Sequence, residues 1–430
     1  IPYEGGSELA VDLLAEKPNS VHCKNALKLG ISRDAAKSIS YACVPVDNSE
    51  VLTSEGWKYY SELSEGDSIL SYNTQTDQIE LDSILKIHHF ENKEVFSASN
   101  TRDYFECTEE HRWFGKQRRG GKSVPRWFEN KFVSFKEMNS EFNILMSAEY
   151  SKTNSNMTVE EARFLGWLLA DGCYKWSGFS RNKKQGLNVK VTQSIQKYIK
   201  ELEEDLENIP YTVFEKTIPS NGNTVRDYLI KPDYPRNLLI KLGVEGIPKH
   251  SVDWVKIVLG MSRECRDNFL HTFYLSDGHA GNRISQNYGK IHEAVSLALY
   301  LQGNRISITK HMTNKCSVIT KHSTRYLTNQ KLIKQSIGVK PTFCITTNNS
   351  TFILRQNKKF ISITGNCLYG AAYPKLMKML GLSDTEAKKM YEDFWDSVAP
   401  LKALRDDLTK AWEENNKSYI VGIDGRKIRV

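Results

Sequence analysis

The spacing of apolar residues changes in character several times along the chain. Residues 1–42 and the stretch after residue 367 carry apolar residues at helical spacing, which predicts helices. From residue 43 to about residue 150, short alternating runs between turn residues predict an all-β region. Residues 158–335 mix helical and strand-like patterns, and residues 341–364 alternate again. The order helical, β, mixed, β, helical predicts an insertion inside an insertion.

The mixed region contains an internal repeat. Residues 158–161 have the sequence of a capping box and open a helix of apolar and small residues that ends near Asp171 and a glycine. A second such helix, from about Ser262, ends near Asp277 and a glycine. One such aspartate is more often an ordinary helix end, but two on repeated helices predict a seam where both carboxylates meet. Paired carboxylates can share divalent ions and cut phosphodiester bonds.

Two cysteines and an asparagine mark the borders of the outer insertion. Cys43 opens the first β region, and Asn366 and Cys367 follow the last strand-like run. An asparagine amide can attack its own main-chain carbonyl and cut the chain after itself, while a cysteine can carry an acyl group on sulfur. Thr108 and His111 supply a hydroxyl and an imidazole that can hold an oxyanion and protonate a departing nitrogen. These residues predict a chain that cuts itself, although a buried structural cysteine is the alternative for Cys43.

Residues 43–150 and 336–366 resemble an intein, a self-splicing domain of the Hint family. Cys43 matches the first residue of the family, Thr108 and His111 match its second block, and Asn366 and Cys367 match its last. The resemblance implies an all-β, horseshoe-like splicing domain that needs no cofactor. It also implies a thioester at Cys43, transfer of the acyl group to Cys367, cyclisation of Asn366, and ligation of the two flanks.

Two positions depart from the usual intein pattern. Gly365 stands where the residue before the asparagine is commonly histidine, and Cys344 stands in a block that often carries aspartate. We therefore expect cyclisation that is slower or assisted differently. Cys344 is a candidate catalytic residue and equally a candidate core residue. A Hint insert that does not splice, and an autoprocessing domain of the Hedgehog kind that uses an external nucleophile, are the alternatives.

Residues 157–335 resemble the two-repeat LAGLIDADG homing endonucleases. The resemblance implies an α/β fold of αββαββα repeats whose strands form a saddle over double-stranded DNA. It makes Asp171 and Asp277 catalytic and metal-binding residues for Mg²⁺ or another divalent cation. Lys249 lies in a stretch that resembles the block between the repeats, where a catalytic lysine often occurs, although an exposed surface lysine is the expected alternative. A degenerate endonuclease that binds DNA without cutting it is a further alternative.

The flanks, residues 1–42 and 367–430, become one continuous pattern when Ala42 is joined to Cys367. Cations and aromatics then recur every four residues on one helical face. The joined, mainly helical segment resembles the fingers helix of family A DNA polymerases. The resemblance implies that nucleotide and primer-template DNA are partners of the full spliced polymerase, contacted by His22, Arg33, Lys37, Tyr41 and Tyr369. The metal-binding palm carboxylates are absent and the sequence begins without methionine, so we expect an inactive polymerase fragment.

Composition adds limits to these hypotheses. The 430 residues carry a formal net charge of +8, which permits nucleic-acid binding, and eight cysteines without metal-ligand spacing, which indicates reduced thiols. No apolar run reaches the roughly 18 residues of a membrane span, so no membrane partner is expected. Residues 116–131 are basic with interleaved aromatics, and we expect a solvated loop there rather than a DNA contact. We expect a monomer in the cytoplasm of a bacterial or phage-infected cell, associated with the nucleoid.

Overall fold

The computed structural model describes residues 43–120, 127–177, 186–218, 222–310, 316–328 and 332–366, together with residues 410, 420–421 and 427–428. By backbone contacts the chain divides into two compact units, residues 43–366 on the one hand and residues 1–42 with 367–430 on the other. In the second unit the structure describes one antiparallel strand pair, β23 (Ile420–Val421) and β24 (Lys427–Ile428). The predicted flank residues lie outside the described residues: His22, Arg33, Lys37, Tyr41, Cys367 and Tyr369.

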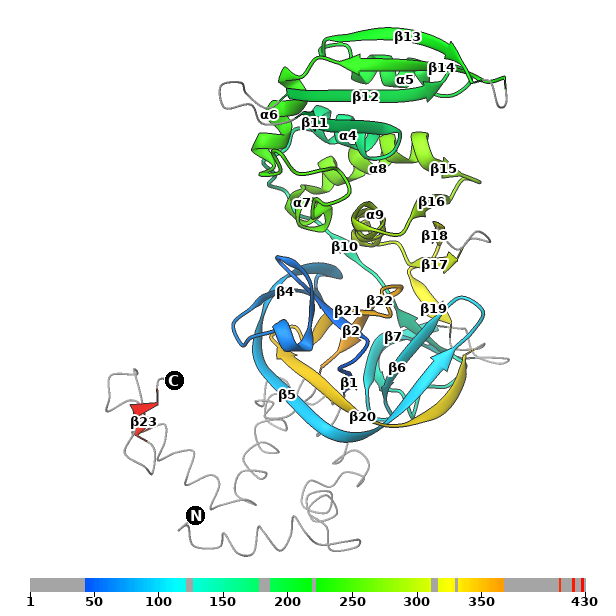
Figure 1. The fold of residues 1–430 in the computed structure, drawn as a ribbon. Coiled ribbons are helices and arrows are strands. Elements are labelled where there is room, and N and C mark those ends of the chain that lie inside the picture. The colour runs from blue at the N-terminus through cyan, green and yellow to red at the C-terminus, as the bar shows by residue number, and fades with distance from the viewer. Residues whose placement is uncertain are drawn as a thin grey trace, which may run out of the picture. The chain divides into compact units, whose positions relative to one another are not determined.

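A ten-stranded sheet organises the first β region and the last one (Figure 1). Its longest strands, β5 (Gln78–Ser99) and β20 (Ile333–Thr347), pair antiparallel along almost the whole of β20. Register shifts between Ser336 and Gly338 and between Lys340 and Thr342 interrupt this pairing, and such bulges bend a strand. The two strands therefore curve together around the rest of the sheet, as Figure 1 shows.

The remaining strands of this region are short. The main path of the ten-stranded sheet runs β1-β20-β5-β4-β2-β21-β22, with β3, β6 and β10 paired to it at the side. A separate four-stranded sheet has the order β19-β9-β7-β8. Their bounds are β1 (Val44–Pro45), β2 (Ser49–Thr53), β3 (Gly56–Tyr59), β4 (Ser68–Asn73), β6 (Tyr104–Thr108), β7 (Arg112–Arg119), β8 (Trp127–Ser134), β9 (Phe142–Leu145), β10 (Glu149–Tyr150), β19 (Tyr326–Thr328), β21 (Thr351–Gln356) and β22 (Phe360–Gly365), with a short 3-10 helix η1 (Tyr60–Glu62).

The mixed region consists of two sheets that have the same strand order. The order β11-β12-β14-β13 of the first sheet is repeated as β15-β16-β18-β17 in the second, and every pair is antiparallel. This is the duplication that the repeated helices predict. The strands are β11 (Gly172–Ser177), β12 (Gly186–Ser194), β13 (Tyr211–Thr217), β14 (Thr224–Ile230), β15 (Gly278–His279), β16 (Arg283–Asn287), β17 (Ile306–Lys310) and β18 (Cys316–Lys321), and the helices are α4 (Val159–Leu169), α5 (Ile199–Asp205), α6 (Asp233–Lys241), α7 (Trp254–Gly260), α8 (Arg263–Asp277) and α9 (Lys290–Leu301).

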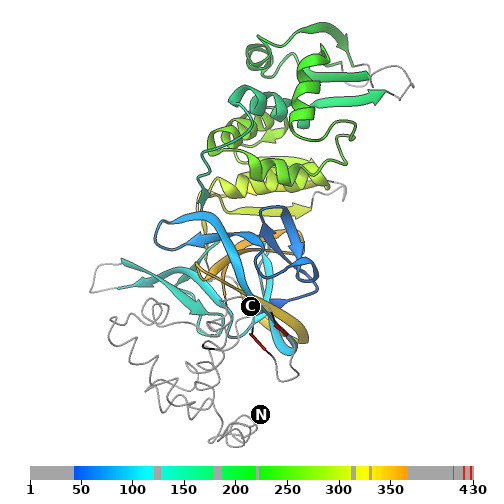
Figure 2. The ribbon, with the colours of Figure 1, turned by 90° about the vertical axis from the view of Figure 1, so that its left-hand side faces the viewer.

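Helices α4 and α8 pack side by side between the two sheets (Figures 1 and 2). The predicted capping box is present, because the Thr158 hydroxyl accepts from the Glu161 N–H at 3.2 Å and the Glu161 carboxylate accepts from the Thr158 N–H at 2.8 Å. A methyl group added at Gly166 would overlap the Thr272 hydroxyl and the carbonyl of Phe269 on α8. The glycine therefore permits the helices to approach closely enough for both Asp-Gly ends to meet.

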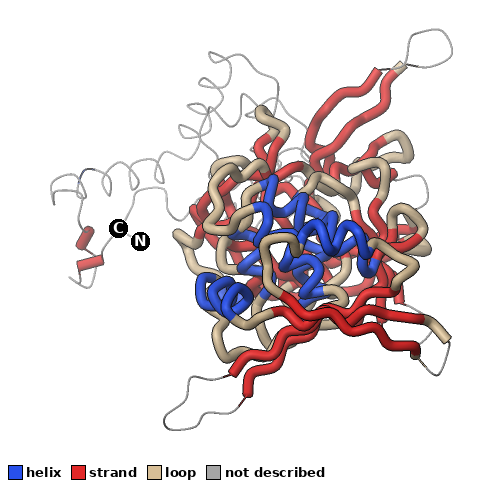
Figure 3. Tube along the Cα trace, turned by 90° about the horizontal axis from the view of Figure 1, so that it is seen from above, coloured by secondary structure: helices blue, strands red, loops and turns tan. Residues whose placement is uncertain are grey.

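A continuous apolar core joins the mixed region to the ten-stranded sheet. It includes residues of β2, β4, β21 and β22 together with those of α4, α8 and α9, and a second core lies within the β region itself. Figure 3 shows the helices gathered in the middle with strands around them. Ile353, Ile361 and Ile363 occupy one face of the β21–β22 pair and belong to the shared core, whereas Phe352, Leu354 and Phe360 occupy the other face.

Two details differ from the expectations. Residues 116–131 are not a loop: β7 and β8 form an antiparallel hairpin here, because Arg119 pairs with Trp127 across it, and only residues 121–126 lie outside the described chain. After β18 the chain already pairs with the β region, since β19 pairs with β9 and β20 begins at Ile333. Among the described residues no helix is long and apolar enough to cross a membrane.

Candidate functional site

Cys43, the first residue of the 43–366 unit, lies against Thr108. Cys43 is fully buried, and its backbone N–H donates to the Thr108 hydroxyl at 3.1 Å. The Thr108 N–H donates to the Cys43 carbonyl at 3.0 Å, so the strand end is held from both sides. The nitrogen of Cys43 is the one that would depart if the bond before it were broken. The Thr108 hydroxyl therefore lies beside the leaving nitrogen and accepts from it. The oxyanion-holding role predicted for Thr108 and the proton-donating role predicted for His111 stay predictions.

The side chain of His111 reaches the last strand of the sheet. Its Nε2 is hydrogen-bonded to the Thr364 hydroxyl, and its ring packs edge-on against Trp113 with centroids 5.2 Å apart. Backbone bonds from His111 to Thr108 at 3.0 Å and from Phe135 to His111 at 2.7 Å fix the turn that carries the imidazole. Thr364 lies two residues before Asn366, so the imidazole bonds to the strand that leads to Asn366, while the backbone N–H of His111 bonds to Thr108.

Asn366 is fully buried, and its carbonyl, its side-chain nitrogen and its backbone N–H are each hydrogen-bonded. The Arg112 guanidinium donates from Nη2 to the Asn366 carbonyl at 2.9 Å, and the Asn366 Nδ2 donates to the Thr347 carbonyl at 3.5 Å. The Asn366 N–H donates to the Ser350 carbonyl at 3.0 Å. The carbonyl that receives the guanidinium is the one that the side-chain amide would attack. Arg112 can therefore stabilise the negative charge that develops there.

Steric crowding explains why a glycine occupies position 365. A Cβ added there would lie 2.7 Å from the Arg112 carbonyl and 3.2 Å from two ring atoms of Phe132. The Arg112 guanidinium itself stacks on the Phe132 ring at 4.9 Å. The space in which a histidine before the asparagine would stand is filled by this Arg-Phe pair, which places a cation on the Asn366 carbonyl instead. Sequence reasoning missed Arg112, whose only signal was its place directly after His111.

Cys344 lies in the buried C-terminal part of β20. Its exposed fraction is zero, and its thiol donates to the Ile345 carbonyl at 3.6 Å. Val44 pairs with Phe343 in the β1–β20 ladder, so extending this register by one residue sets Cys43 opposite Cys344. The structure thus places the second candidate thiol in the strand that faces the first.

The two aspartates of the repeat meet at the end of the α4–α8 seam. Asp171 accepts a hydrogen bond from the Ser276 hydroxyl, and Ser276 directly precedes Asp277 on α8. Burial, and next the charge of Asp171, raise the pKa of Asp277 to about 6. Two carboxylates that lie close together in a half-buried site repel each other, and a cation bound between them would offset this repulsion.

Lys249 corrects the expectation of an exposed surface lysine. It is 8% exposed, and its ammonium group donates to the carbonyl of Gly172, the residue after Asp171, at 2.6 Å. The segment that carries it is held by the Trp254 indole, which donates to the Lys249 carbonyl at 2.8 Å. Burial lowers the pKa of Lys249 to about 8, and the charges of Asp277 and Asp171 oppose this shift. The lysine thus belongs to the aspartate site.

Two glutamines that the sequence did not single out complete the carboxylate site. Gln193 of β12 donates to Asp171 at 3.4 Å, and Gln286 of β16 donates to Asp277 at 3.0 Å. The strands are the second of each sheet, so the two contacts repeat the duplication of the fold. No spacing rule pairs these glutamines with the aspartates, because the contact depends on how each strand returns beside its helix.

The carboxylate pair fits a hard divalent cation. Among the described residues, no group of three or more His, Cys, Asp or Glu side chains is placed to hold a metal ion. Mg²⁺ does not need such a cage, because it keeps several waters and binds through one or two carboxylates together with substrate phosphates. Asp171 and Asp277 supply the two carboxylates, and the crowding that raises the pKa of Asp277 is what such a cation would offset.

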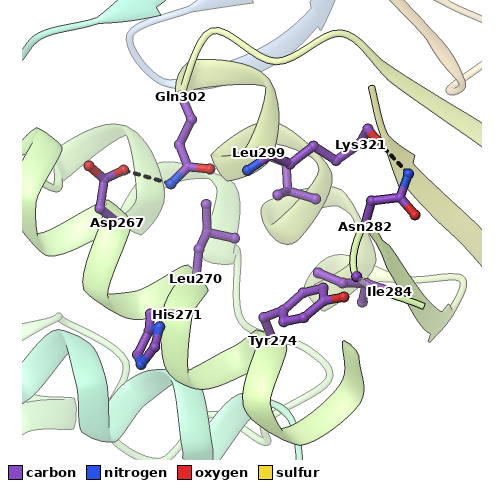
Figure 4. A pocket seen from close by; sticks show the side chains of 10 residues that line it. Asp267, Leu270, His271, Tyr274, Asn282, Ile284, Leu299, Gln302 and Lys321 are labelled. Carbon is purple, nitrogen blue, oxygen red and sulfur yellow. Dashed lines mark hydrogen bonds between the residues drawn. The ribbon is translucent and has the colours of Figure 1, made fainter. Parts of the chain in front are cut away.

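A separate pocket of about 290 Å³ lies beside α8 (Figure 4). Asp267 accepts from Gln302 at 2.7 Å, and Asn282 donates to the Lys321 carbonyl at 3.0 Å. The first bond ties α8 to the end of α9, and the second ties the loop before β16 to β18. None of the predicted site residues is among the residues lining the pocket, so it remains separate from both candidate sites.

No family model matches the sequence, and no curated protein matches it. Among solved structures, a mesophilic variant of the homing endonuclease I-DmoI aligns with 39% of this chain and 91% of its own, at 17% identity and a TM-score of 0.29. A bacterial intein-like domain from Clostridium thermocellum aligns with 25% of this chain and 68% of its own, at 17% identity and a TM-score of 0.20. A mutant of the Ssp DnaB mini-intein aligns with 76% of this chain and 99% of its own, at 8% identity and a TM-score of 0.25. Structures of I-DmoI exist in complex with DNA and Mn and with DNA and Ca.

Proposed function

We propose that residues 43–366 are an intein that excises itself and joins its flanks. One observation carries the proposal: at each of the two amide bonds that splicing would break, a side chain suited to assist the cleavage is hydrogen-bonded to the amide. The nitrogen of Cys43 is bonded to the Thr108 hydroxyl, and the carbonyl of Asn366 is bonded to the Arg112 guanidinium. His111 is linked to both sides, by its backbone bond to Thr108 and by its side-chain bond to Thr364.

The proposed steps follow from these contacts. The Cys43 thiol attacks the carbonyl before it, so that a C–S bond forms and the bond to the Cys43 nitrogen breaks. The thiol loses a proton and the released nitrogen, which is bonded to the Thr108 hydroxyl, gains one. Cys367 takes the acyl group from Cys43, and the Asn366 Nδ2 then attacks its own carbonyl with Arg112 on the oxygen. A shift of the acyl group from sulfur to nitrogen leaves a peptide bond between the flanks. No cofactor is needed.

The intact mass of the expressed chain tests this proposal. The expected products are residues 43–366 and residues 1–42 joined to residues 367–430. Cys43→Ala should remove the joined product, and Asn366→Ala should stop release of residues 43–366. Recovery of the unspliced chain alone, over a range of pH and time, would contradict the proposal. Release of the first flank only with an added nucleophile, without a joined product, would favour autoprocessing of the Hedgehog kind.

We also propose that the mixed region, within residues 157–335, is a homing endonuclease that cuts double-stranded DNA. The carrying observation is the pair Asp171 and Asp277 at one seam with the buried Lys249 beside them. Mg²⁺ or another divalent cation held by the two carboxylates would supply Lewis-acid chemistry at the phosphate. Gln193 and Gln286 orient the carboxylates, and Lys249 provides a positive charge.

Cleavage of a plasmid that carries the uninterrupted junction of the flanks tests the nuclease. With Mg²⁺ the chain should cut the plasmid, and Asp277→Asn should abolish cutting while DNA binding without metal, followed by gel shift, persists. The matched control is Asp267→Asn, which changes an aspartate on the same helix outside the seam. Equal cutting by Asp277→Asn and the control would contradict the assignment. Absence of cutting by every form, with DNA binding retained, would indicate a degenerate endonuclease.

The host in this proposal is a family A DNA polymerase. This part rests on the sequence of the flanks, in which Arg33, Lys37, Tyr41 and Tyr369 fall on one helical face once the middle is removed. Nucleotide and primer-template DNA are then partners of the complete spliced polymerase, and the DNA site of the endonuclease lies in the uninterrupted polymerase gene. We propose a cytoplasmic, nucleoid-associated monomer.

A further inference from the structure

We propose that Asp82 is a positioning residue for the cyclisation of Asn366, acting through the turn between β20 and β21; the inference rests on the splicing function proposed above. Asp82 lies on β5 and touches neither junction. It holds the turn whose carbonyls hold the reacting asparagine.

The Asp82 carboxylate accepts hydrogen bonds from the turn between β20 and β21. The turn consists of residues 347–350, with the Ser350 N–H donating to the Thr347 carbonyl at 3.3 Å. Asp82 accepts from the N–H groups of both central residues, Asn348 at 3.4 Å and Asn349 at 2.9 Å, and from the Asn348 side chain at 2.7 Å. A carboxylate is the only side chain that can accept so many bonds at once without carrying a proton of its own.

Further contacts fix the carboxylate itself. The Ser71 hydroxyl donates to Asp82 at 3.1 Å and the Ser83 N–H donates at 2.7 Å. Asp82 is 9% exposed. Burial by itself would raise the pKa of this carboxyl, but the hydrogen bonds from Asn349, Asn348, Ser83 and Ser71 hold the pKa below its ordinary value. Asp82 is therefore ionised throughout the neutral range and keeps all its acceptor positions.

The turn in turn fixes the position of the Asn366 side-chain amide. Its first carbonyl, on Thr347, accepts from the Asn366 Nδ2 at 3.5 Å, and its last, on Ser350, accepts from the Asn366 N–H at 3.0 Å. Ser350 has a φ of 61°, a left-handed conformation that a serine holds only where its surroundings impose it. Loss of the Asp82 bonds would release this turn, and the orientation of the asparagine amide with it.

Orientation matters because cyclisation is an intramolecular attack. The Asn366 Nδ2 forms a bond to the Asn366 carbonyl carbon while the bond to the Cys367 nitrogen breaks. One proton leaves Nδ2 and one is gained by the Cys367 nitrogen, so no oxidant or reductant takes part. Reactions of this kind owe much of their rate to holding the attacking atom in place, and small displacements cost about a hundredfold.

The experiment measures the two junction cleavages separately in the full chain. A Cys43→Ala background allows only the Asn366-dependent release of residues 367–430, and an Asn366→Ala background allows only cleavage before Cys43 by dithiothreitol. Asp82→Asn and the milder Asn348→Ala are placed in both backgrounds. Asp77→Asn is the control, because Asp77 lies in the same β4–β5 hairpin but bonds to Tyr72 and Arg325 instead of the turn.

We expect Asp82→Asn to slow release of residues 367–430 at least tenfold and Asn348→Ala to slow it less, while thiol cleavage changes by less than about twofold. Asp77→Asn should leave both rates near the parent values. Equal slowing of both cleavages, or of neither, would overturn the role of Asp82 while the splicing function stands. Absence of release from the Cys43→Ala parent would instead overturn the splicing function and this inference with it.

Discussion

At the scale of single residues, the cyclisation that we propose at Asn366 depends on one cation and on the space left for it. Arg112 follows His111 along the chain, and its guanidinium stacks on Phe132 and bonds to the Asn366 carbonyl. Gly365 leaves room for the Arg112 backbone, which any larger residue would contact too closely. An Arg at this place carries a fixed charge that no pH change in the neutral range removes.

Arg112→Gln is expected to slow cyclisation of Asn366 about a hundredfold, the loss typical of one donor removed from a developing oxyanion. The measurement is release of residues 367–430 from the Cys43→Ala chain over time. The cyclisation rate of Arg112→Lys should lie between those of the parent chain and Arg112→Gln, because lysine keeps the charge but not the planar donor group. The control is Arg119→Gln, which changes an exposed arginine of the same strand paired with Glu129. If Arg112→Gln and the control cyclise at the same rate, the proposed role of Arg112 is wrong.

At the scale of elements, helix α9 joins the repeat to the β region. Its buried apolar residues belong to the core shared with β21 and β22, and Glu293 on its first turn lies 3.5 Å from Arg355 of β21. Arg355 is itself buried, paired with Glu50 at 2.7 Å and stacked on Trp57 at 4.5 Å. His292 of the same helix is 3% exposed, and burial lowers its pKa from 6.5 to about 4.

The lowered pKa of His292 predicts a loss of stability in mild acid. The folded state keeps this imidazole neutral, so its contribution is complete above the unfolded pKa of about 6.5 and is lost as the pH falls towards about 4. At pH 5 the free energy of unfolding should be about 2 kcal/mol lower than at pH 7.5 on account of this residue. Urea unfolding of the Cys43→Ala, Asn366→Ala chain at both pH values measures the difference. His292→Gln should reduce the difference in the free energy of unfolding between the two pH values by about 2 kcal/mol. If the substitution leaves that difference unchanged, the imidazole is not held neutral.

At the scale of the whole 43–366 unit, the mixed region covers one face of strands β21 and β22, whose other face carries Thr364, the hydrogen-bond partner of His111. Thr364 shares the inner face of β22 with Phe360 and is paired with Phe352. Ile361 and Ile363 point the other way, into the core shared with α9. Strand β22, which ends just before Asn366, is therefore packed from both sides, and the mixed region contributes one of those sides.

Replacing residues 152–324 by a short glycine-serine linker should therefore leave an apolar face uncovered. Ile353, Ile361 and Ile363 would lose burial worth about 1.5–3 kcal/mol each, which lowers the free energy of unfolding by several kcal/mol. The measurements are soluble yield, urea unfolding and the rate of splicing. Changing the three isoleucines to threonine in the shortened chain should recover solubility, whereas the same changes in the full chain should destabilise it. A shortened chain as stable as the full one would contradict the shared core.

The sequence alone determined the elements whose signals are local. Alternation and helical spacing separated the β region from the repeat, the capping box and the Asp-Gly ends located α4 and α8, and the chemistry of Cys43 and Asn366 indicated the junctions. Only the tertiary structure decided which distant groups serve those residues. Arg112 and Asn366 are 254 positions apart, and their contact depends on the placing of two strands of different sheets. The burial of Lys249 and the bonds from Asp82 to the turn before β21 depend likewise on packing and sheet pairing, which no short stretch of sequence encodes.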